Sequence, residues 1–216
     1  MKKLILLLIA CTTLITSPCD ARNPIVEIDT TMGKIVVELF EKERPKTVAN
    51  FLKYVDEGFY DDTIFHRVIP NFMVQGGGFE SIPYLKQPYA SIPNESSIDI
   101  LNKKGTIAMA RKRDLNSANS QFFINTQDNP FLDTSKYAVF GKVILGMDTV
   151  KKIEAVKTKT IDGFDDVPIE KITIKKTCRL AIPVAKAPAP AQPILTASVA
   201  PTTSSTTPTQ NSTIRQ

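Results

Sequence analysis

Short apolar runs separated by turn residues fill the middle of the chain, and they predict β-strands. The first two runs, 25–28 and 34–40, flank Asp29-Thr-Thr-Met-Gly33 and predict a hairpin whose turn is supplied by Gly33. The other predicted strands are 63–68, 72–75, 105–111, 121–126, 137–143 and a last alternating strand after Pro168 that carries Ile169, Ile172 and Ile174.

Apolar residues recur at helical spacing in only two segments. The first follows Arg44-Pro45, because proline is tolerated in the first turn of a helix, and Gly58 stands where a left-handed cap would end it. The two apolar stripes are Val48, Phe51, Leu52 and Val55 in the first helix and Met147, Val150 and Ile153 in the second. Residues 80–103 are predicted to be irregular. Many short strands with two helices predict a mainly β fold, a closed antiparallel barrel.

The N-terminal end of the chain differs in composition from the middle. Met1-Lys2-Lys3 precedes an apolar run over 4–9 and small residues over 11–17, which is the pattern of a secretory signal. We expect residues 1–21 to be a signal peptide cut near Ala21, with lipoprotein processing at Cys11 as the alternative. The apolar run is shorter than the ~20 residues of a membrane span. This predicts export to the periplasm, or secretion, without stable membrane insertion after cleavage.

The composition changes again near residue 180. Residues 181–216 consist mainly of Pro, Ala, Thr and Ser, with no acidic residue and only Lys186 and Arg215 as basic residues. Such a segment buries too little apolar surface to offset the entropy of ordering, so we expect a disordered tail. The remaining residues, 22–180, have the length of one domain with its own core, which we expect to be a monomer.

The positive charge of the chain belongs largely to its ends. The formal net charge is +5 at pH 7, but four of the 27 basic residues and one of the 22 acidic residues lie outside 22–180. The domain itself is therefore close to +2, which is a weak basis for a nucleic-acid partner, and we expect none. Arg111-Lys112-Arg113 is a local basic run that is interpreted as a solvated loop rather than a phosphate site.

Most schemes of acid–base and metal chemistry lack the residues that they need. A serine or cysteine nucleophile needs a base, and His66 is the only histidine in the chain. Cys178 is the lone thiol expected after signal removal, and no cysteine spacing suggests zinc. Gly76-Gly-Gly78 matches neither GxGxxG nor a P-loop, and Asp165-Asp166 is interpreted as a solvated loop. We expect no metal and no cofactor.

One predicted hairpin combines a fixed charge with apolar side chains. If strands 63–68 and 72–76 pair around Asn71, Arg67 lies opposite Gln75, and Phe65 lies opposite Gly77. Gln75 could then accept a hydrogen bond from the guanidinium and orient it, although a purely structural Arg–Gln pair remains open. Strand alternation puts His66 on the other face, in a structural role.

Large apolar residues near this hairpin are candidates for the floor of a site. They are Phe72, Met73, Phe122, Phe123, Phe131 and Leu132. Alternation sends Phe122 and Phe123 to opposite faces of their strand, so only one of them can line the same surface as Arg67.

Four motifs resemble the cyclophilin family of peptidyl-prolyl isomerases, in family order and with family-like spacing. They are Phe65–Gly77, Gly105-Thr-Ile-Ala-Met-Ala110, Ser120-Gln-Phe-Phe-Ile124 and Val139-Phe-Gly-Lys142. The resemblance covers residues 24–176. It implies an eight-stranded barrel capped by two α-helices, a site on the outer face of the barrel, and proline-containing polypeptides as substrates.

The resemblance also implies roles for individual residues. Arg67 matches the catalytic arginine and Gln75 its supporting glutamine. The proline pocket falls on Phe72, Met73, Phe123 and Leu132, and the peptide groove on Ala110 and Gln121. Phe131 and Tyr137 stand where many eukaryotic members have tryptophan and histidine, and both departures resemble exported bacterial cyclophilins.

The sequence therefore predicts a peptidyl-prolyl cis-trans isomerase that accelerates X-Pro bond rotation in exported proteins and assists their folding. The alternative is a chaperone or adhesion module that binds proline-containing segments, with incidental turnover. A small-ligand carrier is a third reading, against which a polar Arg67–Gln75 pair argues.

Overall fold

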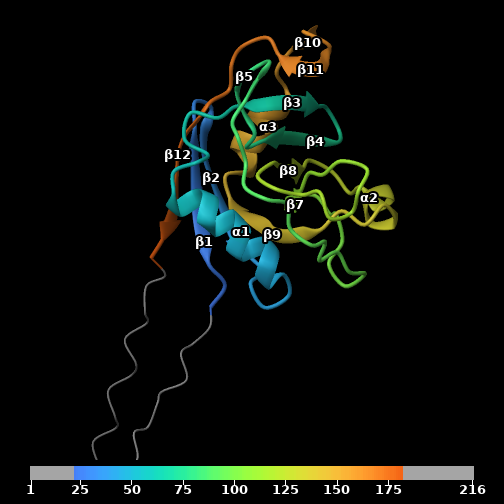
Figure 1. Cartoon of the computed structure of the whole chain (residues 1–216). Coiled ribbons are helices and arrows are strands. Elements are labelled where there is room, and N and C mark those ends of the chain that lie inside the picture. The colour runs from blue at the N-terminus through green and yellow to red at the C-terminus, as the bar shows by residue number, and fades with distance from the viewer. Residues whose placement is uncertain (1–21, 182–216) are drawn as a thin grey trace, which may run out of the picture. The chain divides into compact units, whose positions relative to one another are not determined.

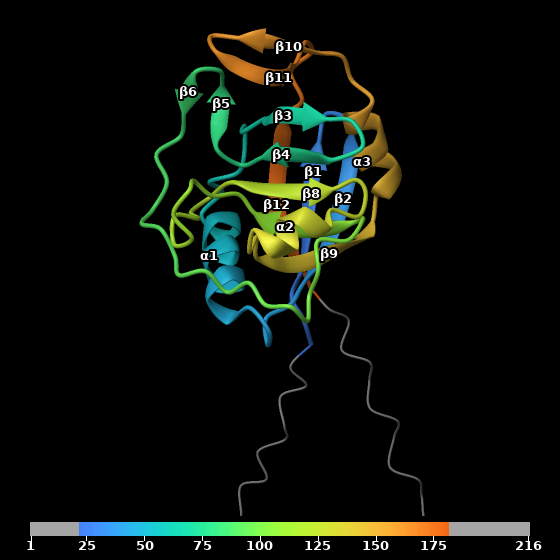
Figure 2. The same ribbon diagram turned by 90° about the vertical axis from the view of Figure 1, so that its right-hand side faces the viewer.

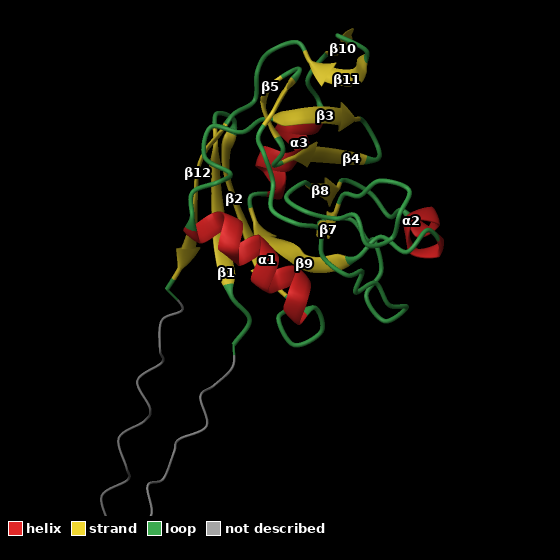
Figure 3. Ribbon diagram, in the orientation of Figure 1, coloured by secondary structure: helices red, strands yellow, loops and turns green. Residues whose placement is uncertain are grey.

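The computed structural model describes residues 22–181. Its main element is an eight-stranded antiparallel sheet in the order β12-β1-β2-β9-β7-β8-β4-β3 (Figures 1 and 3). The strands of this sheet are β1 (Ile25–Thr30), β2 (Gly33–Leu39), β3 (Phe65–Ile69), β4 (Met73–Gly76), β7 (Thr106–Met109), β8 (Phe122–Asn125), β9 (Val139–Leu145) and β12 (Ile174–Leu180).

Two short hairpins and three helices complete the described part of the chain. The hairpins pair β5 (Phe79–Ser81) with β6 (Tyr84–Leu85) and β10 (Thr158–Ile161) with β11 (Phe164–Pro168). The helices are α1 (Pro45–Asp56), α2 (Pro130–Thr134) and α3 (Met147–Glu154).

The sheet curls, but its hydrogen-bond ladder does not close as we predicted from the sequence. The two edge strands, β12 and β3, share no ladder and meet only near an isolated bridge between Ile64 and Thr173. Beyond that bridge, β11 lies along β3, and Figure 2 shows β11 and β10 stacked next to β3 at the end of the sheet. The free edge of β3 is thus covered by a hairpin rather than by β12.

The concave side of the sheet holds the main hydrophobic core. Val26, Ile35 and Phe122 from the strands pack there with Phe51 of α1 and Val150 of α3, all of them fully buried. The two helices lie on two sides of the curled sheet (Figure 2). Burial of their apolar stripes confirms both predicted helices, and Gly58 after α1 has the expected left-handed conformation, with φ of +64°.

A second, smaller apolar cluster lies on the outer, convex side of the same sheet. It contains Met73 of β4, Ala108 of β7, Phe123 of β8, Val139 of β9 and Leu132 of α2. Neighbouring residues of one strand therefore belong to different clusters, as the alternation of side chains along a strand requires. This outer cluster is the platform on which the candidate site is built.

Several elements differ from those that the sequence predicted. Helix α2 and the hairpins β5–β6 and β10–β11 were not expected. The last strand begins at Ile174, whereas Ile169 is 52% exposed and lies outside it. The predicted signal peptide (1–21) and nearly all of the predicted tail (181–216) lie outside the described residues. No helix within 22–181 is both long enough and apolar enough to cross a membrane.

Candidate active site

A hollow of about 510 Å³ lies on the outer face of the sheet, above the second apolar cluster. Nine of the ten residues predicted to form the site line it: Arg67, Phe72, Met73, Gln75, Ala110, Gln121, Phe123, Leu132 and Tyr137. The tenth, Phe131, is not among its lining residues. Its side chain is 55% exposed, and its ring packs against Phe72 with 5.3 Å between ring centroids. Phe131 therefore stands next to the hollow rather than in it.

The floor of the hollow is apolar and comes from three elements. Strands β4 and β8 place Met73 and Phe123 there, and α2 places Leu132. Helix α2 starts with Pro130, and the Asn129 side chain before it donates to the carbonyl oxygen of Phe72 at 2.9 Å. Asn129 thereby links the start of α2 to the turn between β3 and β4. This contact fixes the position of α2 relative to the strands that form the floor.

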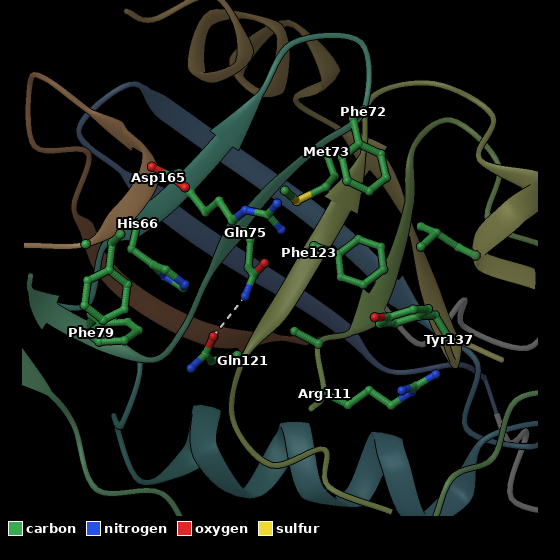
Figure 4. Close-up of a pocket in the computed structure, with 15 residues that line it drawn as sticks. His66, Phe72, Met73, Gln75, Phe79, Arg111, Gln121, Phe123, Tyr137 and Asp165 are labelled. Atoms are coloured by element: carbon green, nitrogen blue, oxygen red, sulfur yellow. Dashed lines mark hydrogen bonds between the residues drawn. The ribbon is translucent and has the colours of Figure 1, made fainter. Parts of the chain in front are cut away.

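The predicted register between Arg67 and Gln75 is confirmed, because the two residues are directly paired across β3 and β4. The predicted hydrogen bond between them is not formed within residues 22–181. Gln75 instead donates from Nε2 to Oε1 of Gln121 at 2.9 Å (Figure 4). Arg67 has its Nε 3.6 Å from Oδ2 of Asp166, which is an ion pair rather than a hydrogen bond.

The position of His66 corrects the sequence analysis. A β-bulge between Phe65 and Arg67 places Phe65 opposite Gly76 rather than Gly77. Because the bulge inserts one extra residue, alternation fails there and His66 lines the hollow (Figure 4). Arg67 lines the same hollow. The pKa of His66 is lowered to about 4, mainly by burial and in smaller part by the nearby charge of Arg67.

Arg111 lines the hollow, but its guanidinium is already engaged in contacts with other residues of the protein. It lies over the ring of Tyr137, 4.4 Å from the centroid, and donates to the carbonyl oxygens of Lys112 and Ser135. The Tyr137 ring in turn contacts the edge of Phe123, with 5.8 Å between centroids. Arg111 therefore braces one wall of the hollow.

The opposite wall was missed by the sequence analysis. Phe79 of β5 and Gly163, Phe164 and Asp165 of the β10–β11 hairpin line the hollow beside His66. The interpretation of Asp165-Asp166 as a loop was wrong, because both residues belong to β11, although Asp165 is exposed to solvent as expected. The signal that could have found this hairpin is Asp162-Gly163, since Asp-Gly between β-rich runs favours a two-residue turn and both residues have positive φ.

Among the described residues, no group of three or more His, Cys, Asp and Glu side chains could hold a metal ion. The hollow brings together three kinds of side chain. It combines a half-exposed guanidinium, two linked glutamine side chains and an apolar floor.

Comparisons with known proteins agree on one family. The family model "Cyclophilin type peptidyl-prolyl cis-trans isomerase" matches residues 25–179. A peptidyl-prolyl cis-trans isomerase of Acinetobacter baylyi is 50% identical over 156 residues, which cover 70% of this chain and 83% of that protein. Peptidyl-prolyl cis-trans isomerase B of Escherichia coli is 46% identical over 159 residues, covering 69% and 96%.

Solved structures agree with the sequence relatives. A cyclophilin-type isomerase of Cryptosporidium parvum superposes with a TM-score of 0.64 at 31% identity, covering 74% of this chain and 99% of the other. A second structure of that protein, in the presence of the dipeptide Ala-Pro, gives a TM-score of 0.63 at 30% identity, covering 73% and 99%. The chain belongs to the cyclophilin-type peptidyl-prolyl cis-trans isomerase family.

Proposed function

We propose that this chain accelerates X-Pro bond rotation in proline-containing polypeptides, with Arg67 as the catalytic residue. The observation that carries the proposal is the presence of Arg67 in the same hollow as the apolar floor formed by Met73, Phe123 and Leu132. The Arg67 side chain stays 43% exposed despite its ion pair, so its charge is open to a ligand. The structural neighbour studied with Ala-Pro supports a proline ring as the group that the floor receives.

The chemistry requires no proton transfer and no covalent intermediate. Rotation about a peptide bond has a barrier of ~18–20 kcal/mol because conjugation resists twisting. Twisting returns a lone pair to the proline nitrogen, which is a poor acceptor while the amide is planar. A guanidinium placed at that nitrogen therefore stabilises the twisted amide more than either planar form, and that difference is what lowers the barrier. Arginine suits this task because it stays charged and its N–H donors are rigidly arranged.

Gln75 is the proposed supporting residue of the site. Its Nε2 is occupied by Gln121, while its Oε1 has no partner among the described residues and remains able to accept a hydrogen bond. Because Gln75 is paired with Arg67 across the hairpin, that oxygen is available to the guanidinium when substrate is bound. Ala110 also lines the hollow, and its small side chain is the proposed place where the peptide backbone passes.

The size of the required effect shows that Arg67 cannot act alone. A ~10⁵-fold acceleration corresponds to about 7 kcal/mol. One well-placed donor supplies roughly 2.7–4 kcal/mol. The apolar floor must contribute the rest, by holding the proline ring still and by surrounding the less polar twisted amide with apolar atoms.

The test is the exchange between the cis and trans signals of a short X-Pro peptide, measured by NMR with and without the domain. Arg67→Ala is expected to lower kcat/KM by ~10²-fold while the domain stays folded, because it removes the one donor. Arg67→Lys should also be impaired, since a point charge cannot reproduce the fork. An unchanged rate in Arg67→Ala would contradict the role of Arg67. Tight peptide binding by the wild-type domain without exchange would instead favour a proline-binding chaperone or adhesion module.

The cellular setting is a separate part of the proposal. We infer that the chain is an exported bacterial cyclophilin that works as a monomer in the periplasm and assists protein folding there. The support is the signal-like composition of residues 1–21 and the phenylalanine and tyrosine at positions 131 and 137. Cell fractionation of the full chain tests it, together with mass spectrometry of the mature N-terminus. A cut near Ala21 in periplasmic material is expected, whereas a lipid on Cys11 or cytoplasmic retention would contradict it.

A further inference from the structure

The β10–β11 hairpin carries an irregularity that faces the catalytic arginine. Lys159 pairs with Val167 and Ile161 with Phe164, so β11 contains one more residue than β10 between these two pairs. Two residues of β11, Asp165 and Asp166, therefore lie opposite a single residue of β10, Thr160. Bulges of this kind re-aim side chains and are frequent beside active sites. Here the bulge allows two adjacent aspartates to contact the same site. Asp165 lines the hollow, and Asp166 forms an ion pair with Arg67.

Asp166 holds this position in a conformation that most residues avoid. Its φ is +62°, in the left-handed region, where Asp and Asn are tolerated better than other residues with a side chain. The neighbouring Asp165 is fixed separately, since its Oδ1 accepts a hydrogen bond from the Thr160 hydroxyl at 2.8 Å. An unusual backbone conformation that the surrounding hairpin enforces is a reason to look for a functional contact.

The contact that Asp166 makes is the only hydrogen bond or ion pair of the Arg67 guanidinium within residues 22–181. Oδ2 of Asp166 lies 3.6 Å from Nε, with 37% and 43% of the two side chains exposed. A guanidinium has one N–H at Nε and four more on its two terminal nitrogens. An anion on the Nε side therefore restrains the plane of the group while leaving the terminal donors available.

We propose that Asp166 is a positioning residue for Arg67, and this rests on the proposed catalytic role of Arg67. The hairpin holds a carboxylate behind the guanidinium so that its terminal N–H groups are directed into the hollow before substrate arrives. Preorganised donors act without reorienting during the reaction, which is where their catalytic value lies. Gln75, which is bound to Gln121, does not provide this restraint in the described structure.

The expected effect falls mainly on kcat. Asp166 is not among the residues that line the hollow, so binding of the proline ring should change little. Exposed ion pairs are weak, so the loss of one corresponds to a factor of a few in rate, roughly two- to fivefold. Removing the anion also makes the electrostatic potential around the Arg67 guanidinium more positive. Since arginine is charged in either case, we expect the loss of direction to outweigh that gain.

The experiment compares Asp166→Asn with Asp162→Asn in the X-Pro exchange assay. Both changes are isosteric, remove one negative charge from the same hairpin and occur at a residue with positive φ, +62° at Asp166 and +49° at Asp162. Only Asp166 contacts Arg67. Asp166→Asn should lower kcat by roughly two- to fivefold with KM within about twofold, while Asp162→Asn matches the wild type.

Two further measurements separate positioning from a structural role. The NMR signal of the Arg67 Nε–H group, assigned by its loss in Arg67→Lys, should shift in Asp166→Asn and stay in place in Asp162→Asn. In the Arg67→Lys background, Asp166→Asn should have no further effect on kcat, because lysine has no Nε–H group to restrain.

The outcomes also distinguish this proposal from the one on which it rests. An inactive Arg67→Ala variant together with a fully active Asp166→Asn variant would overturn the positioning role and leave the proposed function intact. An equal loss in Asp166→Asn and Asp162→Asn would overturn it too, because it would indicate a general charge effect of the hairpin. A fully active Arg67→Ala variant would overturn the proposed function itself.

Discussion

Phe122 and Phe123 are identical side chains at adjacent positions of β8, and they lie in opposite surroundings. The Phe122 ring makes edge contacts with the rings of Phe51, Tyr60 and Phe65 inside the curled sheet. The Phe123 ring contacts the Tyr137 ring and otherwise lines the hollow. The inner face of the sheet therefore seals its aromatic residues on all sides, whereas the outer face leaves one side open to a ligand. The same residue type stabilises the fold in one place and forms a binding floor in the other.

The largest expected effect comes from truncating these two residues in turn. Phe122→Ala should lower the free energy of unfolding by about 3–5 kcal/mol, because the cavity that it leaves is sealed. Phe123→Ala should lower it by only about 2 kcal/mol, since its space opens into the hollow and water can enter. Urea unfolding of both variants measures these values.

The two truncations should affect catalysis in the opposite order, with the larger loss of kcat/KM in Phe123→Ala. Where both variants are folded, Phe123→Ala should lower kcat/KM for an X-Pro peptide by about tenfold or more, through loss of a buried apolar contact to proline. Phe122→Ala should leave kcat/KM within about twofold of the wild type. A reversed order of the two activities would show that the outer cluster is merely a second core.

The same strand shows how far the sequence predicts the structure. Alternation alone assigns Phe122 and Phe123 to opposite faces, and the structure confirms it because β8 is regular. Alternation fails at His66, because the extra residue of a bulge leaves no mark in the hydrophobic pattern. Helix α2 was not predicted for a different reason. It has five residues, which is too short for a helical repeat of apolar positions to be recognised in the sequence.

Contacts between segments far apart in the chain were the least predictable part of the site. The resemblance supplied nine residues that line the hollow. Seven of them lie within its motifs, and Leu132 and Tyr137 lie between the third and the fourth motif. The wall formed by Phe164 and Asp165, and the contact from Asp166 to Arg67, depend on how a later hairpin covers the free edge of β3. Nothing in either segment alone specifies that packing.

The pH dependence of stability gives a second test of the difference between the two faces, because they bury different titratable groups. On the inner face, burial raises the pKa of Tyr60 well above its ordinary value of 10.0. On the outer face, burial lowers the pKa of His66 from 6.5 to about 4. As pH falls from about 6.5 to about 4, the unfolded chain binds a proton at His66 that the folded protein does not. The free energy of unfolding should therefore fall over that window, by on the order of 3 kcal/mol.

Urea unfolding at a series of pH values measures this loss. His66→Asn removes the titrating group, so its free energy of unfolding should decline less steeply between pH 6.5 and 4 than that of the wild type. The carboxylates are shared by both proteins and cancel in the difference. Parallel curves for the two proteins would mean that His66 is not held neutral in the outer hollow.

The smallest expected effects come from adding one methyl group to a glycine on each face. At Gly141, a Cβ atom would lie 2.5 Å from the Glu38 carbonyl oxygen and 3.0 Å from Cγ2 of Ile107. Because the carbonyl belongs to the neighbouring strand, Gly141→Ala should cost about 1–3 kcal/mol of stability. At Gly78, a Cβ atom would lie 2.5 Å from Cγ of Gln121, a flexible side chain that can turn away.

Gly78→Ala should therefore leave the free energy of unfolding within about 1 kcal/mol of the wild type, yet break the hydrogen bond from Gln75 to Gln121. Release of Gln75 removes a contact worth roughly 0.5–1.5 kcal/mol, which corresponds to a two- to tenfold fall in kcat/KM. Gly141→Ala is the matched control, since it should lose stability while the folded fraction keeps its activity. If Gly78→Ala keeps full activity although NMR shows Gln121 displaced, the Gln75–Gln121 pair contributes nothing to catalysis, and the outer face depends on Arg67 and its apolar floor alone.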